Sequence, residues 1–469
     1  MTTIDYKAIE ALVESDLLES RRLLTRSVTD DPKYSTLDKI RENYAGFIRE
    51  VFKAHKTALP ILVKRILYLE DLISKANGTS TGSQNTGTAK LSFWKHVLEK
   101  SYDAFVWMNV GMDRSSFKKV FKGKKHGDLA HQNIESVLGY VSGVNKNQDE
   151  IAIPLDFCSI TPICDVLRVS FSEDNKARQL TFIEMKSGRV NNEMLDTIHS
   201  GTIEGYLKFF DAHGEGGIKQ MEHYFRQAER LEKGYKLVGA EPGVYENPDQ
   251  PKQNLLILSS EVGLERFSDK VSQLLEKASK REYAVGEVDG CLIMGAVNTF
   301  DEKTLMLGEY DIRLYIYHSF IDPAALDGAP LPENLPQILA AIKLIDWLEG
   351  LGSVVLNPIL LRNLPDARLM DLLLGRIRLK LFFHAQSFID LCKRKGLDAR
   401  LINRKAFNRL QLSGSDQGLS KFNGEYIQLT IPENIQVVGD GTYHEMLFNW
   451  VYPRSVIDQT QQLKFPHAS

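Results

Sequence analysis

Apolar positions in the first 110 residues repeat at the spacing of an amphipathic helix. The repeat runs through Ile9, Leu12, Val13, Leu17 and Leu24, then Ile40, Tyr44, Phe47, Ile48 and Val51, then Leu62, Ile66, Leu69 and Ile73, and it returns at Phe93, Trp94, Val97 and Leu98. Pro60 stands where the third of these helices would begin, and the first turn is the position at which a helix tolerates proline. The pattern predicts a helical N-terminal module over residues 1–112.

Residues 77–89, NGTSTGSQNTGTA, contain no large apolar side chain. A segment of this composition has no surface to bury in a core, so it predicts a flexible loop within the helical module.

Beyond residue 126 the apolar repeat shortens to two, which is the period of a strand. Three strands are predicted at IAIPLDF, CDVLRVSF and QLTFIEMK, and the last two are joined by the polar turn SEDNKAR. A helix is expected before them at GDLAHQNIESVLGYVSG, and a long helical stretch with the motifs IEGYLKFF and IKQMEHYFRQAERLEKG after them. The strand NLLILSS and the helix LERFSDKVSQLLEKASK complete a predicted α/β core over residues 113–285.

Residues 286–469 stay mixed in pattern and predict a C-terminal α/β module of unknown role. One long apolar helix is expected across LMDLLLGRIRLKLFFHAQSFIDLCKRKG, because the segment closes with three cations and a glycine, as helices commonly do.

Composition narrows the class of protein. Of the 469 residues 43% are hydrophobic and 25% charged, and the formal net charge is −3, which excludes a disordered chain and a uniformly basic coat protein. The four cysteines form no C-x-x-C pair, the N-terminus has no signal-peptide pattern, and no uncharged apolar stretch approaches 18 residues. We therefore expect a cytoplasmic multi-domain protein without a membrane partner.

Candidate chemistry begins at the end of the third predicted strand, Phe182-Ile183-Glu184-Met185-Lys186. Side chains alternate along a strand, so Glu184 and Lys186 share one face. One use of such a pair is a magnesium site, in which Glu184 supplies an oxygen ligand and Lys186 stabilises negative charge on a phosphate. The other interpretation is a surface ion pair at a strand end.

The preceding strand supplies a second acid. Asp165 opens CDVLRVSF, and the hairpin turn would return Glu184 to its side, so that two hard oxygen ligands for Mg²⁺ or Mn²⁺ converge. Asp156 is a second candidate for the same position, although strand pairing favours Asp165.

Two helical motifs flank these strands. Upstream, Gly127, His131 and Glu135 follow a G-x-x-x-H-x-x-x-E spacing, and residues four apart share a helix face. Downstream, Gln220 and Tyr224 are again four apart. Taken singly, each motif is also compatible with an ordinary helix surface.

Four motifs follow one another over roughly residues 115–285: G-x-x-x-H-x-x-x-E, a strand Asp, the strand motif EMKSG and Q-x-x-x-Y. In this order they resemble the RecB-type branch of the PD-(D/E)XK nucleases. Family members carry D/E-x-K-T-G in the central strand, and here Ser187 replaces the threonine. The resemblance implies a restriction-endonuclease-like core, with a mixed central sheet flanked by helices, that hydrolyses phosphodiester bonds of DNA with Mg²⁺ or Mn²⁺.

The resemblance also implies residue roles. His131, Asp165, Glu184 and the Met185 carbonyl match the family's metal ligands, Lys186 its catalytic lysine, Gln220 and Tyr224 its supporting helix motif, and Glu135 matches by spacing. It further implies a prokaryotic setting, in antiviral defence or in DNA processing beside a partner ATPase or helicase. No G-x-x-x-x-G-K-[ST] motif is present, so an ATP-driven motor would be another subunit. The alternative is a catalytically silent nucleic-acid-binding or scaffolding subunit, and homo-oligomer formation stays open.

Two basic stretches could contact nucleic acid. The run from Arg114 includes Lys118, Lys119, Lys122, Lys124 and Lys125 without an acid, just before His131. Clustered cations attract a phosphate backbone without reading its sequence. A second stretch, Lys393 to Arg409, contains seven cations and one acid. It either extends the same nucleic-acid-binding surface or ends a helix.

Overall fold

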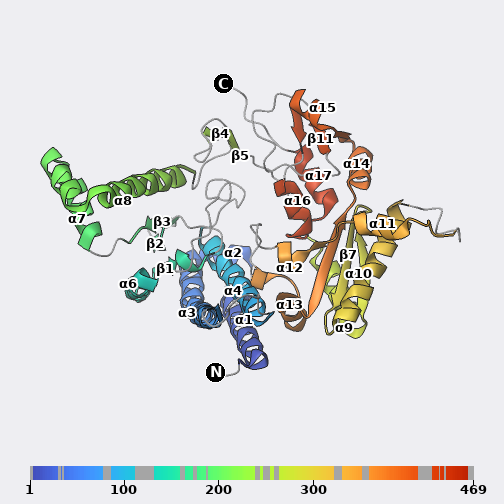
Figure 1. The fold of residues 1–469 in the computed structure, drawn as a ribbon, viewed down its shortest axis with the longest axis horizontal. Helices are drawn as coiled ribbons and strands as arrows, with labels where there is room; N and C mark the ends of the chain where they lie inside the picture. The colour runs from blue at the N-terminus through green and yellow to red at the C-terminus, as the bar shows by residue number, and fades with distance from the viewer. Residues whose placement is uncertain are drawn as a thin grey trace. The chain divides into compact units, whose positions relative to one another are not determined.

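The computed structural model describes residues 4–29, 33, 36–77, 86–110, 131–158, 164–172, 177–185, 189–237, 243–246, 254–257, 264–321, 330–350, 359–409, 425–431, 434–437 and 440–462. The chain divides into two compact units. The first holds residues 1–241, 245–255 and 358–361, and the second holds residues 242–244, 256–357 and 362–469. Both are mixed in helix and strand (Figure 1), so the general α/β class is confirmed.

The first unit begins with a helical module. Its helices are α1 (Tyr6–Thr29), α2 (Leu37–Glu42), α3 (Tyr44–Asn77) and α4 (Thr86–Val110). Helix α3 packs against both α1 and α4, and the short helix η6 (Ile359–Leu361) joins the same bundle. Arg21 of α1 donates a hydrogen bond of 3.0 Å to the Leu360 carbonyl. Residues 6–29, 37–42, 44–77 and 86–110 are thus helical.

Two details of that module differ from the sequence pattern. Helix α3 continues through Pro60 instead of beginning there, because Pro60 lies on the exposed side, where water can replace the backbone donor that proline lacks. The predicted loop 77–89 ends early, since α4 begins at Thr86. A methyl group at Gly87 would collide with the Tyr6 hydroxyl, so glycine permits this close approach. Residues 78–85 lie outside the described part.

The rest of the first unit is a small sheet with helices. Its elements are α6 (His131–Val144), β1 (Glu150–Pro154), η2 (Leu155–Phe157), β2 (Val166–Ser172), β3 (Ala177–Ile183), α7 (Arg189–Ser200) and α8 (Ile203–Leu237). The paired strands β4 (Gly243–Glu246) and β5 (Asn254–Ile257) follow, and each has residues assigned to both units. Strands β1, β2 and β3 pair antiparallel in that order. The sequence predicted the three strands and the β2–β3 hairpin, but the sheet is antiparallel where the family resemblance implied a mixed one. The register sets Pro154 opposite Val166, and Val166 opposite Ile183.

The two faces of this sheet meet different helices. On one face α6 packs Val137 against Ala152 and Val166, with Ile183 and Met185 at the margin. On the other, Phe171 of β2 makes an edge contact with Tyr44 of α3, with ring centroids 5.6 Å apart. The helical module therefore covers one face of the sheet and α6 the other.

Helix α8 is broken at Gly214, whose φ of 56° and ψ of −144° are not helical. Glycine tolerates this backbone, which a residue with a Cβ would adopt only with strain. The two parts of α8 enclose an apolar cluster with α7, built on Met194, Phe209 and Met221. In Figure 1 the pair of helices forms the green arm.

Two antiparallel sheets lie within the described residues of the second unit. Strands β6 (Tyr283–Val288), β7 (Leu292–Asn298), β9 (Ile377–Phe383) and β8 (Ile345–Asp346) form one sheet in the order β6-β7-β9-β8. Strands β10 (Asp398–Ile402), β11 (Tyr426–Ile431) and β12 (Asn434–Val437) form the other. The helices are α9 (Ser268–Lys280), α10 (Glu302–Ile316), η3 (Tyr317–Ile321), α11 (Leu335–Ala341), α12 (Trp347–Gly350), α13 (Asp366–Leu373), α14 (Ala385–Arg394), α15 (Arg404–Arg409), α16 (Asp440–Leu447) and α17 (Pro453–Gln461).

The single long helix expected near the C-terminal end of the chain is wrong. Helix α13 ends at Leu373, Gly375 takes a φ of +73°, and residues Ile377–Phe383 form β9 before α14 begins. Strand β9 lies between β7 and β8. Both of its faces carry buried side chains, so its apolar run resembles that of a buried helix.

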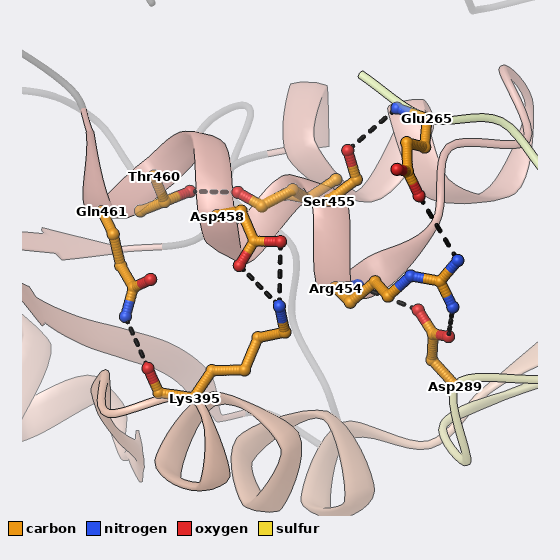
Figure 2. A network of polar contacts seen from close by, with 9 residues as sticks. Glu265, Asp289, Lys395, Arg454, Ser455, Asp458, Thr460 and Gln461 are labelled. Carbon is orange, nitrogen blue, oxygen red and sulfur yellow. Dashed lines mark hydrogen bonds and ion pairs between the residues drawn. The ribbon is translucent and has the colours of Figure 1, made fainter. Parts of the chain in front are cut away.

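Helix α17 is fastened by polar contacts (Figure 2). Arg454 donates to Asp289 Oδ1 at 3.0 Å and to Glu265 Oε2 at 3.3 Å, while Lys395 donates to both oxygens of Asp458 at 2.6 and 2.8 Å. These contacts link α17 to the β6–β7 turn and to the end of α14.

No helix within the described ranges is both long and apolar enough to cross a membrane. The expected division at residues 112 and 285 stays a prediction; residue 285 lies within β6 of the second unit.

Candidate active site

Three carboxylates come from the same end of the β1-β2-β3 sheet. Asp165 immediately precedes β2, Glu184 immediately follows β3, and Asp156 lies in η2 just after β1. The Leu155 N–H donates to the Asp165 carbonyl at 2.8 Å, which extends the β1–β2 pairing to this point. The Met185 N–H donates to Asp165 Oδ2 at 2.5 Å. The hairpin thus places Asp165 beside the Glu184–Met185 segment.

A helix residue that the sequence motifs did not single out reaches Glu184. Gln227 of α8 donates its side-chain amide to Glu184 Oε1 at 2.8 Å. Gln220 and Gln227 are seven residues apart and therefore lie on similar faces of α8. Extending the Q-x-x-x-Y motif by two helical turns from Gln220 would have identified Gln227 as a candidate.

Asp156 carries an electrostatic signature of the site. Burial, and then the nearby charge of Glu184, raise the pKa of Asp156 from 3.8 to about 6. A carboxyl group with such a pKa takes up or releases a proton near neutral pH, which is a property enriched at functional sites. Asp156 therefore belongs to the same acidic group as Asp165 and Glu184.

Helix α4 holds the turn that carries Asp156. The Tyr102 hydroxyl donates to the Pro154 carbonyl at 2.7 Å, and the Cys158 thiol donates to Asp103 Oδ1 at 3.0 Å. Burial, reinforced by the charges of nearby groups including Asp156, raises the pKa of Tyr102 well above its usual value, so the phenol stays a donor. These contacts fix both ends of η2 to the helical module. The sequence motifs did not indicate them.

Cys164, next to Asp165, is kept as a neutral thiol. Burial raises its pKa well above the usual range, and the charges of Glu184 and Asp165 act in the same direction. A metal-ligating cysteine must be a thiolate, so this thiol is a poor ligand. The donors at this end of the sheet are oxygens.

The upstream helix motif lies on α6. Glu135 is exposed, and within the described part of the chain it makes no hydrogen bond or ion pair. Helix α6 packs on the face of the sheet that includes Val166 and Ile183. Strand alternation sets Asp165 and Glu184 toward the other face. The His131 side chain lies outside what the structure describes.

Among the described residues, the downstream motif, Gln220 and Tyr224, contacts α7 and not the carboxylates. Gln220 donates to Asn191 of α7, and Tyr224 packs against the apolar cluster between α7 and α8. These two residues join the helices of the arm, while Gln227 contacts the acids.

The remaining predicted residues are outside the described part of the chain. They are Lys186, Lys118, Lys119, Lys122, Lys124 and Lys125.

The donor chemistry of the site suits Mg²⁺ or Mn²⁺. Asp165 and Glu184 supply hard oxygens, and a carboxylate has about four lone-pair sites, so it can accept hydrogen bonds and still ligate a metal ion. Among the described residues, however, no three His, Cys, Asp or Glu side chains lie close enough to hold a metal ion. A metal at this position would need further ligands, such as the His131 imidazole and the Met185 carbonyl.

Comparison of the chain with protein-family models, with characterised proteins and with solved structures finds no match.

Proposed function

We propose that this protein is a divalent-metal-dependent nuclease that hydrolyses phosphodiester bonds in DNA, with a core like that of the RecB-type PD-(D/E)XK nucleases. The carrying observation is that Asp156, Asp165 and Glu184 come from the same end of three neighbouring antiparallel strands, and that the charge of Glu184 adds to burial in raising the pKa of Asp156. A bound cation would offset the repulsion between such carboxylates.

The residue roles follow from position. Asp165 and Glu184 would hold Mg²⁺ or Mn²⁺ together with His131 and the Met185 carbonyl, and the ion would supply charge stabilisation for the phosphate. Lys186, two residues after Glu184 in the sequence, would stabilise the charge that develops on the scissile phosphate. Gln227 orients Glu184 through its amide. Glu135, exposed on α6 and one helical turn after His131, would contact solvent or substrate.

The biological setting we propose is prokaryotic antiviral defence or DNA processing, with a partner ATPase or helicase supplying any translocation. This part of the proposal rests on the motif resemblance alone, and such a protein would work in the cytoplasm.

The test is cleavage by the purified full chain with Mg²⁺ or Mn²⁺. Linear, circular and single-stranded DNA and a matched RNA are incubated with and without EDTA. We expect metal-dependent cleavage of DNA. Binding of nucleic acid without cleavage under every condition would favour the silent scaffolding subunit instead.

Two variants separate the proposed roles. Lys186→Ala should lower the cleavage rate at least 10²-fold while the Mg²⁺-induced rise in Tm persists, because the lysine stabilises charge without coordinating the ion. Glu184→Gln should lose both the cleavage and the Mg²⁺-induced rise. Lys208→Ala, an exposed lysine of α8 paired with Glu204 at 2.8 Å, is the control and should retain both. Cleavage at the wild-type rate by Lys186→Ala contradicts the assignment.

The acids are distinguished in the same assay. Asp165→Asn should remove Mg²⁺ binding, whereas Asp156→Asn should weaken it less, because Asp165 is bound to the Glu184–Met185 segment. The reverse order would exchange the roles of Asp156 and Asp165.

A further inference from the structure

Six exposed cations follow one another along three consecutive elements of the second unit. We call them the basic track: Lys393 and Arg394 at the end of α14, Arg400 in β10, and Arg404, Lys405 and Arg409 in α15. The intervening strand β10 has five residues. At about 3.3 Å per residue it separates the two ends of the track by roughly 16 Å.

Within the described ranges, the cations of the basic track lack the acidic partners that Lys75 and Lys280 possess. Lys75 pairs with Asp71 at 2.6 Å and Lys280 with Glu276 at 2.7 Å, each four residues apart on a helix. Across the described ranges, no member of the basic track forms an ion pair with a carboxylate. Lys395 on the same turn does, since Asp458 of α17 binds it (Figure 2). The positive charge of the track is therefore available to a ligand.

Helix stability does not explain the arrangement. Cations at the end of α14 are favoured by the helix dipole, but Arg404 and Lys405 occupy the first turn of α15, where the dipole opposes positive charge. The first turn of α15 contains no acid to offset them. Residues placed against the local preference point to a use outside the helix.

The chemistry of the track fits a phosphate backbone. Four of its six cations are arginines, whose planar guanidinium groups bind phosphate oxygens in pairs. A span of roughly 16 Å matches about five nucleotide steps of a strand. None of the large hydrophobic side chains exposed among the described residues belongs to 385–409, so the track offers no apolar anchor for a lipid bilayer.

We propose that the basic track is a nucleic-acid-binding surface of the second unit, which contacts successive phosphates without reading base sequence. The choice of nucleic acid as its ligand rests on the proposed function. The track would hold substrate by contacts separate from the acids of the first unit, and each phosphate contact would release counterions and add steep salt dependence.

The test is binding of the full chain to duplex DNA, single-stranded DNA and RNA of one length in EDTA, at several salt concentrations. The triple variant Arg404→Gln, Lys405→Gln and Arg409→Gln should flatten the slope of log K against log salt by up to about 3 units on duplex DNA. Raising the salt from 50 to 200 mM should therefore weaken the binding of the wild type by up to about 60-fold more than that of the variant. The control, Lys270→Gln, Lys277→Gln and Lys280→Gln, alters the charge of α9 equally and should leave the slope near wild type.

The outcomes are separable. Equal slopes for the two triple variants, or no change in either, overturn the proposal. Loss of binding to phosphatidylserine vesicles with unchanged nucleic-acid binding also overturns it, and assigns the track to a membrane surface. Cleavage with Mg²⁺ is measured in parallel. If the wild type does not cleave but the track variant loses binding, the nuclease proposal fails and the track stands; if the wild type cleaves and the track variant binds normally, the track proposal fails alone.

Discussion

At the residue scale, Lys100 and Asp103 of α4 form an ion pair away from water. Their charged atoms are 3.7 Å apart, and each side chain is only 3% exposed. Asp103 also accepts the Cys158 thiol, so one carboxylate compensates a buried cation and holds the turn that carries Asp156.

Removal of the Asp103 carboxylate should therefore be costly. We expect Asp103→Ala to lower the free energy of unfolding by about 3–5 kcal/mol, because Lys100 remains as an uncompensated buried charge. The matched change Asp71→Ala breaks the exposed pair with Lys75 and should cost less than about 1 kcal/mol. Urea unfolding at pH 7 measures both, and equal losses would contradict this account.

Asp156 makes stability depend on pH in a defined direction. Its pKa is raised from 3.8 to about 6, so the folded state binds the proton more tightly than the unfolded chain does. Ionised Asp156 destabilises the fold above pH 6, and this cost disappears as the pH falls through 6 toward 4.

Asp156→Asn removes the charge and should stabilise the protein at pH 8. Because the group is partly exposed, we expect a gain on the order of 1 kcal/mol, which shrinks to nothing near pH 4. Tm measured from pH 8 to pH 4 checks it. A difference between variant and wild type that stays constant over this range would refute the raised pKa.

At the scale of elements, α10 and β7 approach each other through two glycines. A methyl group built on Gly295 of β7 would collide with Ile312 of α10, and one on Gly308 of α10 would lie 2.6 Å from Val297 of β7. The pair of glycines lets the helix lie close on the sheet, where Ile293, Val297, Ile312 and Ile316 share one core.

Gly295→Ala should accordingly destabilise the second unit by about 1–3 kcal/mol through overpacking. The control is Gly139→Ala in α6, where nothing lies within 4 Å of the added methyl group. Alanine is the better helix former there, so this change should stabilise by about 0.5–1 kcal/mol. Thermal unfolding of both variants tests the packing. Stabilisation by Gly295→Ala would show that α10 can move away from β7 without a loss of stability.

At the scale of the whole molecule, a chain of net charge −3 contains two stretches in which cations far outnumber acids. The stretch with Lys118, Lys119 and Lys122 lies outside the described residues, but it precedes His131 by about a dozen positions. Local positive charge of this kind attracts polyanions although the protein as a whole is slightly acidic.

Replacement of Lys118, Lys119 and Lys122 by alanine should weaken DNA binding about equally on all sequences. The salt slope should flatten by up to about 3 units, while the turnover of bound substrate stays near wild type, because these lysines would contact phosphates away from the scissile bond. Binding isotherms at several salt concentrations measure the slope. If this change and the basic-track change act on the same bound DNA, their effects should add. An unchanged slope would make the first stretch a solvated loop.

The sequence by itself determined the three strands of the candidate site and the acids at their ends. Alternation of period two and the polar turn SEDNKAR are local properties, so they predicted that Asp165 and Glu184 would meet. The helices of the N-terminal module followed from their apolar repeat for the same reason.

Only the tertiary structure decided which distant residues join those acids and which apolar run is a strand. Gln227 reaches Glu184 because α8 turns at Gly214, and Asp103 reaches Cys158 because α4 packs beside η2. Strand β9 is buried between β7 and β8. Its apolar run alone does not distinguish a buried strand from a buried helix. A local pattern fixes the period and the turns of a segment. The partners of a side chain depend on how segments far apart in the chain are brought together, and packing alone sets that.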